Sequence, residues 1–278
     1  RQVTYSRIYV EDTSKILYIR FFANGWNYKI LGLHSNLHFF TVEEGSIHLL
    51  GTDRYGRDLL GRIFLGGRIS LTIALMGAIV TVILGSTLGI ISGYYGGVID
   101  TLVQRSIEIL QSFPQLPLWM ALSAAVPRTW TSLQVFIVMV MIFSFLNWPT
   151  LAREIRGKTL SLREQDFITA IKEMGGSDSR IIFKHLFPNC LSHIIVVLTI
   201  SIPELILMES TLSFLGLGIQ PPMVSWGVLL QGAQRIEVLG LYPWVMLPAL
   251  FIVFAVLGFN FLGDGLRDAA DPYSVKRS

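Results

Sequence analysis

The chain has few of the residues that form metal, disulfide or nucleotide sites. It contains a single cysteine, Cys190, so an intrachain disulfide and a cysteine-rich metal site are both excluded. Charged residues make up only 15%, and the net charge of +3 is too small to indicate a nucleic-acid partner. The phosphate-binding pattern Gly-x-x-x-x-Gly-Lys-Ser/Thr is absent as well. We therefore expect no cofactor in this chain.

Patterns typical of catalysis are also missing. No Ser-His-Asp arrangement is evident among the five histidines. His34 and His38 are four residues apart, as metal ligands on a helix can be, but their surroundings do not have a helical pattern. The charged segment that follows places Arg54, Asp58 and Arg62 at intervals of four, which predicts an interfacial helix with one charged face. We expect neither an enzyme nor a metal site.

Apolar residues, in contrast, are abundant. They make up 52% of the 278 residues, and the mean hydropathy is +0.56, which is too apolar for an ordinary soluble domain. Several apolar runs approach the ~20 residues that a helix needs to cross ~30 Å of hydrocarbon. We expect five membrane spans, at about Ile69–Tyr94, Ile107–Val126, Leu133–Trp148, Leu191–Leu215 and Tyr242–Leu262. The sequence thus predicts an all-α polytopic membrane protein.

The basic residues of the loops predict the orientation of these spans. The loop over 149–190 carries seven lysines and arginines, and the C-terminal tail carries three. Because such residues accumulate in cytoplasmic loops, we place both segments in the cytoplasm. The expected divisions are an extracytoplasmic segment with the interfacial helix at 1–68, a transmembrane domain at 69–263 and a cytoplasmic tail at 264–278.

The first 50 residues differ from the rest in being aromatic and polar. Short alternating patches and the Asn24-Gly25 pair, a common turn sequence, predict a small subdomain with two or three strands. Two roles remain open for it: contact with a substrate-binding protein, or a cap over the membrane domain.

A polar, amphipathic segment, Glu164–Asn189, separates two apolar runs. Its pattern predicts a helix with an apolar face, a break at Gly175, a second helix capped by Ser177 and a stop at Pro188. The residues alone fit two interpretations equally well: a docking site for a soluble partner, or a helix lying flat on the membrane surface.

The same segment resembles the cytoplasmic coupling loop of bacterial ABC-importer permeases. The family pattern is Glu-Ala-Ala, three residues, Gly, nine residues, Ile, one residue, Leu-Pro. Ala170, Gly175 and Pro188 stand at matching positions. The chain departs from the pattern at Thr169, Ile171, His185 and Phe187.

Further blocks resemble the dipeptide/oligopeptide/nickel permeases within this family, and above all the second permease subunit of oligopeptide importers. In order, they cover Leu49–Leu75, Gly93–Arg105, Ser112–Leu118, Glu209–Gly227 and Phe259–Tyr273. The resemblance implies the type I importer permease fold. That fold has six spans, so we expect a further membrane helix before Arg1.

The resemblance also implies a function and partners. The chain would form half of the translocation pathway of an ATP-driven importer of oligopeptides or dipeptides in the bacterial cytoplasmic membrane, surrounded by lipid. A second homologous permease, two cytoplasmic subunits that bind ATP and magnesium, and an extracytoplasmic solute-binding protein would complete it. Coupling to the ATPase subunits would run through the loop over 164–189, by way of Phe167, Ala170, Ile171, Met174, Gly175, Ser177, Ile182 and Pro188.

A glycine series in the first predicted span indicates close helix packing. Gly85, Gly89 and Gly93 lie four residues apart and therefore share one helix face. We call the face formed by these three glycines the glycine seam. It packs either between two helices of the chain or at a moving interface with the second permease.

Two carboxylates, Glu204 and Glu209, fall within the fourth predicted span. Ionisable groups at membrane depth are costly and usually face a cavity or a partner, so both are candidates for the translocation pathway. The alternative for each is a hydrogen-bonded position within the bundle.

Two other functions remain open at this point. The same architecture could import nickel chelates, glutathione or another small solute. A stand-alone ion-coupled transporter or channel belongs to a different class, and the two glutamates would favour it.

Overall fold

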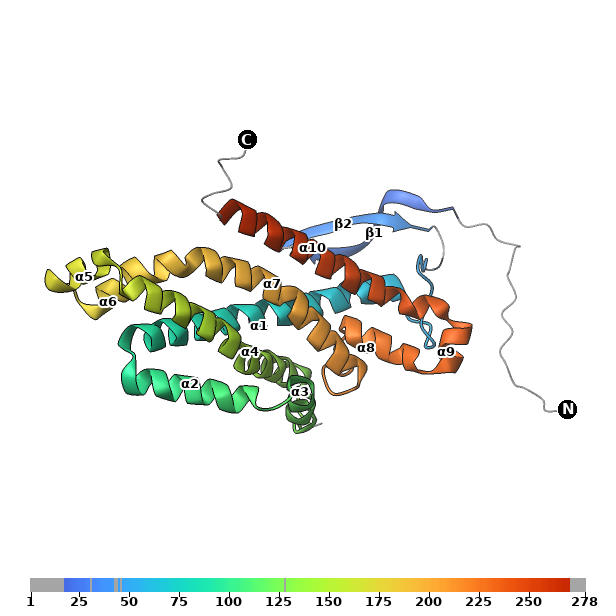
Figure 1. Cartoon of the computed structure of the whole chain (residues 1–278). Helices are drawn as coiled ribbons and strands as arrows, with labels where there is room; N and C mark the ends of the chain where they lie inside the picture. The colour runs from blue at the N-terminus through green and yellow to red at the C-terminus, as the bar shows by residue number, and fades with distance from the viewer. Residues whose placement is uncertain (1–17, 31, 43–44, 46, 128, 271–278) are drawn as a thin grey trace. The chain divides into compact units, whose positions relative to one another are not determined.

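The computed structural model describes residues 18–30, 32–42, 45, 47–127 and 129–270. Its contacts divide the chain into two compact units, residues 1–51 and residues 52–278. The first unit contains a two-stranded sheet, and the second is built from helices (Figure 1).

The sheet is an antiparallel hairpin of β1 (Arg20–Ile30) and β2 (Leu33–Thr41). The chain reverses between the strands at Gly32, whose φ of 86° lies in the region that glycine adopts most readily. Large apolar side chains are exposed on this hairpin, among them Phe21 and Phe39.

The predicted turn at Asn24-Gly25 is wrong. Both residues lie inside β1, where the pairing register shifts between Asn24 and Tyr28. A Cβ added to Gly25 would collide with the ring of His38 on the other strand. Glycine within a strand often marks an irregularity or a close approach of this kind. Gly25 is therefore explained by its close contact with His38, and not by a turn.

The second unit consists of helices of very different lengths. They are α1 (Leu59–Tyr95), α2 (Gly97–Gln111), α3 (Gln115–Ala124), α4 (Ser132–Arg163), α5 (Asp166–Glu173), α6 (Asp178–Ile181), a π-helical turn η1 (Ile182–Leu186), α7 (Phe187–Phe214), α8 (Trp226–Gln231), a 3-10 turn η2 (Gly232–Gln234), α9 (Ile236–Leu241), a 3-10 turn η3 (Pro243–Met246) and α10 (Leu247–Ala270).

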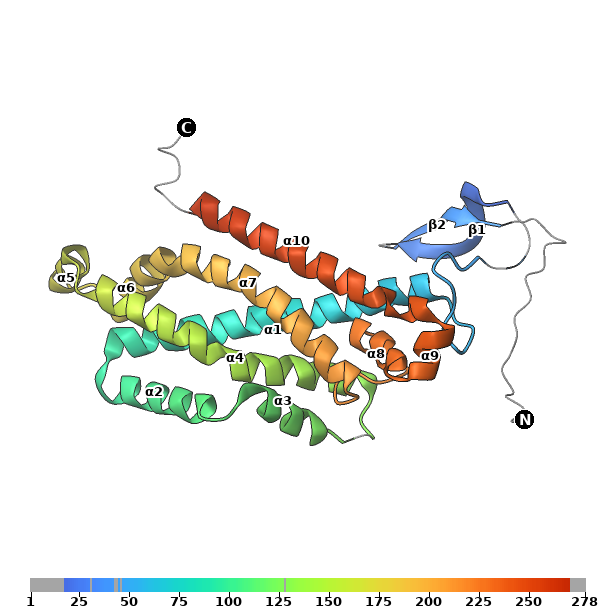
Figure 2. The ribbon, with the colours of Figure 1, turned by 45° about the vertical axis from the view of Figure 1, so that its right-hand side comes forward.

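Four helices in the described part of the chain are long and apolar enough to cross a membrane. They are Leu59–Tyr95, Ser132–Arg163, the continuous run Asp178–Phe214, and Pro243–Ala269. They form an elongated bundle in which α1 packs against α4 and α7, and α7 packs against α10 (Figure 2). At ~1.5 Å per residue, the 37 residues of α1 extend ~55 Å, so this helix projects well beyond a ~30 Å hydrocarbon core.

The predicted span at Ile107–Val126 is not one helix. The chain forms α2 and α3 there, with a break over residues 112–114, and neither helix is long enough alone to cross a membrane. The break falls at Pro114, which lacks an N–H group and disfavours helical geometry in the residue before it.

The predicted charged helix over residues 54–62 is also wrong. Helix α1 begins at Leu59, and the Asp58 carboxylate accepts a hydrogen bond from the Gly61 N–H at 2.6 Å as its N-cap. The residues before it form a turn in which the Asp53 carboxylate accepts from backbone N–H groups two and four residues on. The spacing of four between charged residues therefore does not mark a helix face: it arises because a turn is followed by the Asp58 N-cap of α1.

The glycine series forms a seam between α1 and α4 of this chain. A Cβ on Gly85 would touch α4 at 3.0 Å or more. A Cβ on Gly89 would lie 2.6 Å from the carbonyl oxygen of Ala152, and one on Gly93 would lie 2.9 Å from that of Arg156. Of the two alternatives for these glycines, the structure places the seam within the bundle.

Gly89→Ala should therefore destabilise the bundle by about 2 kcal/mol, because the new methyl group must push α4 backbone away. The measurement is thermal unfolding of the purified protein in detergent. Gly258→Ala is the matched control, since nothing lies within 4 Å of an added Cβ on that α10 glycine. Equal stability of the two variants would contradict the seam.

Candidate functional site

The segment predicted to dock a partner lies at one end of the helical bundle, where α5 and α6 join α4 to α7 (Figure 1). Helix α5 ends just before Gly175, whose φ is 77°, a left-handed conformation that favours glycine. The Ser177 hydroxyl then accepts from the Arg180 N–H at 3.4 Å and caps α6. The helix, break and helix predicted from the sequence are all present.

Pro188, however, does not stop the second helix. Helix α6 continues through the π-helical turn into α7, and Pro188 lies in the first turn of α7. The Phe187 N–H donates to the carbonyl oxygen of Ile182, five residues back. This wider turn accommodates a proline whose ring would clash with the carbonyl four residues back in a regular helix. Ile182 is partly buried against the core.

Helix α5 has two different apolar faces. Ile168 is fully buried, and Ile171 packs against the same core cluster, so these two residues anchor the helix to the bundle. Phe167 and Met174 lie outside the core with 40% and 79% of their surface exposed, and Ala170 is exposed between them. The predicted face of Phe167, Ile171 and Met174 is thus divided between anchoring and exposure.

The end of α1 is tied to this segment. The Tyr94 hydroxyl donates to the Asp178 carboxylate at 2.6 Å, and the Lys172 ammonium lies 4.9 Å from the centre of the Tyr94 ring. Arg163, at the end of α4, donates to the carbonyl oxygens of Gly93 and Tyr94, both at 3.2 Å. A displacement of α5 and α6 would therefore act directly on α1 and α4.

An ion pair and a hydrogen bond that the sequence did not predict connect three helices near the contacts of Tyr94 and Arg163. Arg156 on α4 donates from Nε and Nη2 to Asp100 on α2, at 2.5 and 2.6 Å, and the Ser92 hydroxyl on α1 donates at 2.5 Å. The hydrogen bonds from Arg156 hold the pKa of Asp100 below its usual range, although partial burial opposes this. The partners are 56 residues apart, and no local pattern connects them.

Glu209 is enclosed by the bundle. Its side chain is fully buried and accepts hydrogen bonds from the hydroxyls of Ser70 on α1, at 2.7 Å, and Ser213 on α7, at 2.6 Å. The Ser70 hydroxyl in turn accepts a hydrogen bond from the backbone N–H of Trp226 at the start of α8. Glu209 therefore connects three helices, and in this structure it has the hydrogen-bonded position within the bundle that was the alternative to a pathway role.

Glu204 has a different environment, although it lies only five residues earlier. It is exposed on the face of α7 that also carries the exposed Ile200 and Leu207. A carboxylate on the outer surface of a membrane helix is costly in lipid. This face therefore suits a contact with another chain or with a water-filled pathway.

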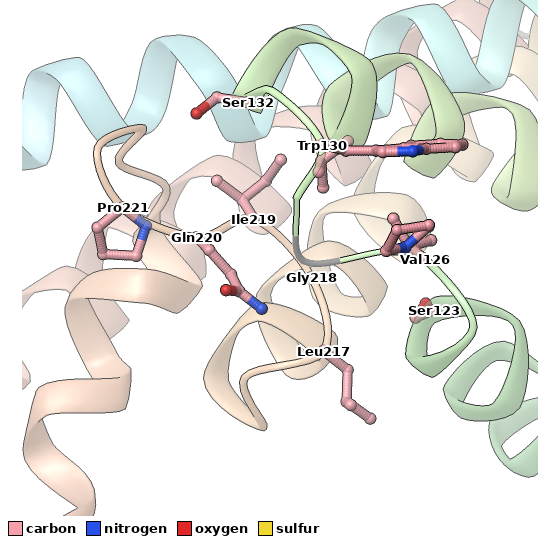
Figure 3. Close-up of a pocket in the computed structure, with 11 residues that line it drawn as sticks. Ser123, Val126, Trp130, Ser132, Leu217, Gly218, Ile219, Gln220 and Pro221 are labelled. Atoms are coloured by element: carbon pink, nitrogen blue, oxygen red, sulfur yellow. The ribbon is translucent and has the colours of Figure 1, made fainter.

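A pocket at the other end of the bundle is too small for a peptide. It lies where the loop between α7 and α8 meets the segment between α3 and α4, with Leu217, Gly218 and Ile219 near Val126 and Trp130 (Figure 3). Its volume is about 80 Å³, well below the ~300–1,000 Å³ of typical ligand pockets. This pocket is therefore not a substrate site by itself.

Comparison with protein families identifies relatives over most of the chain. Residues 85–274 match the family described as the binding-protein-dependent transport system inner membrane component. The oligopeptide transport system permease protein OppC of Haemophilus influenzae is 45% identical over 81% of this chain and 70% of its own length. The dipeptide transport system permease protein DppC of Alkalihalophilus pseudofirmus is 42% identical (81% and 72%). The glutathione transport system permease protein GsiD of Pectobacterium atrosepticum is 40% identical (82% and 73%).

Solved structures share the fold at low sequence identity. A chain of the MetNI methionine ABC transporter in an inward-facing conformation has a TM-score of 0.54 at 17% identity, over 77% of this chain and 98% of that chain. An amino acid ABC transporter chain has a TM-score of 0.53 at 13% identity, over 75% and 94%. These likenesses establish the fold of ABC importer permeases for the helical unit.

Proposed function

This multi-pass membrane protein belongs to the family of binding-protein-dependent transport system inner membrane components, and we propose that it forms half of the translocation pathway of an importer of oligopeptides or dipeptides. The identities of 45% and 42% to an oligopeptide and a dipeptide permease subunit support this substrate class. The glutathione permease subunit is 40% identical, so another small peptide-like solute is the second candidate.

We further propose that the chain works in the bacterial cytoplasmic membrane and leaves ATP hydrolysis to other subunits. Two cytoplasmic ATP-binding subunits would hold ATP and magnesium. A second, homologous permease would complete the pathway, and an extracytoplasmic solute-binding protein would deliver the substrate. The absence of a phosphate-loop pattern from the sequence supports this division of labour.

The main structural support for this function is the loop over 164–189, which contains α5 and α6. Phe167, Ala170 and Met174 form an outward apolar face on α5. The buried Ile168 holds α5 to the bundle, and the Tyr94–Asp178 hydrogen bond holds the adjoining α6 to α1. A partner that binds this face and moves would shift α5, α1 and α4 together. Such a shift suits a rigid-body alternation between inward-facing and outward-facing states.

Purification and reconstitution test this function. A tagged copy of the chain should co-purify with a second permease and with ATP-binding subunits, and liposomes containing the complex should take up labelled peptide only with ATP and the binding protein. The isolated chain should hydrolyse no ATP. Uptake driven by an ion gradient, without any ATPase, would instead support the stand-alone transporter.

Glu204→Gln should reduce uptake of cationic peptides about fivefold, because loss of one nearby charge in a partly hydrated pathway is worth roughly 1 kcal/mol. Uptake of neutral peptides and assembly of the complex should stay unchanged. Glu237→Gln, on exposed α9, is the matched control. Equal effects of Glu204→Gln on the two peptide classes would exclude a pathway role for Glu204.

A further inference from the structure

A second, larger pocket lies at the end of the bundle opposite to α5 and α6. Its volume is about 530 Å³, and its walls come from the turn before α1, the first turns of α1, and helices α8 and α9. Apolar side chains such as Leu59 and Val238 line part of it. Its charged lining consists of one acid and four basic residues: Asp53, Arg54, Arg57, Arg62 and Arg235.

The charges of this pocket do not balance. Asp53 pairs with Arg57 at 2.7 Å and with Arg62 at 3.2 Å. Burial raises the pKa of Asp53, but the hydrogen bonds from Arg57 and the neighbouring backbone outweigh this effect and leave the pKa below its usual range. The ionised carboxylate neutralises one of the four guanidinium groups, so the pocket attracts anions.

Two of the arginines have unused donors. The Nε–H of Arg62 is buried and has no hydrogen-bond partner among the described residues, and only 15% of that side chain is exposed. Arg235 makes no ion pair within the described part of the chain. Because buried N–H donors are normally satisfied, the Arg62 Nε–H is available to an acceptor that enters the pocket, and charged oxygen acceptors form the strongest hydrogen bonds with guanidinium groups.

The pocket also lies at the ends of two of the helices that are long and apolar enough to cross a membrane. The span of α1 begins at Leu59, and the last span begins at Pro243, two residues before Val245 in the pocket wall. Figures 1 and 2 show α8, α9 and the start of α10 beside the first turns of α1. Tyr242 and Trp244, which pack edge to face, are residue types typical of the membrane interface.

An exposed apolar side chain lies next to a pocket arginine. Ile236, which directly follows Arg235 at the start of α9, has 86% of its surface exposed. An anion in the pocket would therefore have apolar protein surface beside it. A ligand with a charged head and long apolar tails fits this combination better than a free ion does.

We propose that this pocket binds the phosphate of an anionic phospholipid such as phosphatidylglycerol, with its acyl chains lying along the neighbouring apolar side chains. The guanidinium groups donate to the phosphodiester oxygens, the interaction for which arginine is best suited. An anionic head group is preferred over a zwitterionic one, because the single acid of the pocket is already paired and leaves no partner for a lipid ammonium. This site goes beyond peptide import and does not depend on the substrate.

Native mass spectrometry of the purified importer complex tests the proposal. Phosphatidylglycerol and phosphatidylcholine with identical acyl chains are titrated separately, and inorganic phosphate is added as a competitor. The wild-type complex should bind phosphatidylglycerol more tightly. The double variant Arg54→Gln/Arg235→Gln, which alters two exposed side chains, should lose about tenfold in that affinity and approach the value for phosphatidylcholine.

Arg62→Gln should give a similar loss of affinity for phosphatidylglycerol. Thermal unfolding checks that this variant folds. If it does not fold, the result of the double variant decides. Arg105→Gln is the control, because this exposed arginine lies on α2 and pairs with Glu108. Equal affinities for the two lipids, or an unchanged preference in the double variant, would overturn the proposal. Displacement by inorganic phosphate without any lipid preference would assign the pocket to a free anion and also overturn it.

Discussion

Phe167→Asp is expected to lower peptide uptake by the reconstituted importer about a hundredfold, while the chain still inserts and pairs with the second permease. A carboxylate forced into an apolar partner surface costs roughly 3 kcal/mol, which corresponds to about this factor in binding. Phe167 is outside the bundle core, so the substitution spares the fold. Uptake, ATPase rate and co-purified ATPase subunits should be measured on the same preparation.

Two substitutions serve as controls for this result. Phe167→Leu keeps the apolar surface and should retain most uptake. Ile168→Asp alters the adjacent, fully buried residue and should prevent folding of the chain, since it places a charge in the core. Normal uptake by Phe167→Asp would mean that α5 is only a surface helix.

Gly175→Val should impair the same coupling through the backbone. At a φ of 77° a side chain costs about 1–2 kcal/mol in strain, although there is open space around the position. The strain is relieved if α5 changes its orientation, which would misplace the outward face. Gly157→Val is the matched control, because that helical glycine also has open space but no positive φ. Equal activity of the two variants would contradict this account.

Glu209→Leu is expected to destabilise the protein by about 3 kcal/mol, because it leaves the buried hydroxyls of Ser70 and Ser213 without their acceptor. Thermal unfolding in detergent would show this as a lower midpoint and reduced yield. Glu209→Gln retains one acceptor oxygen and should have a smaller effect. Glu204→Leu, on the exposed face of the same helix, should change stability by only a few tenths of a kcal/mol.

An unchanged midpoint for Glu209→Leu would show that the serines find other partners within the bundle. The two glutamates also test different properties: Glu209 tests the stability of the fold, and Glu204 tests transport. Loss of Glu209 should reduce the amount of folded protein, whereas loss of the Glu204 charge should change uptake by a correctly folded protein.

Four of the five predicted spans coincide with helices that are long and apolar enough to cross a membrane, because crossing a hydrocarbon core demands length and hydrophobicity that composition records directly. The region from Ile107 to Val126 has the same composition but bends at Pro114. Proline is tolerated within other membrane helices when neighbours satisfy the freed groups, as at Pro203 in α7. Hydropathy alone could not distinguish the two cases.

The sequence by itself determined the apolar spans, the glycine break after α5 and the family, since each is written in residues close together along the chain. Only the tertiary structure decided that Ile171 anchors α5 while Met174 is exposed. It also revealed the surroundings of Glu209, whose partner Ser70 lies 139 residues away. Periodicity shows which residues share a helix face, but the direction of that face depends on contacts between distant segments, and these exist only after the helices have packed.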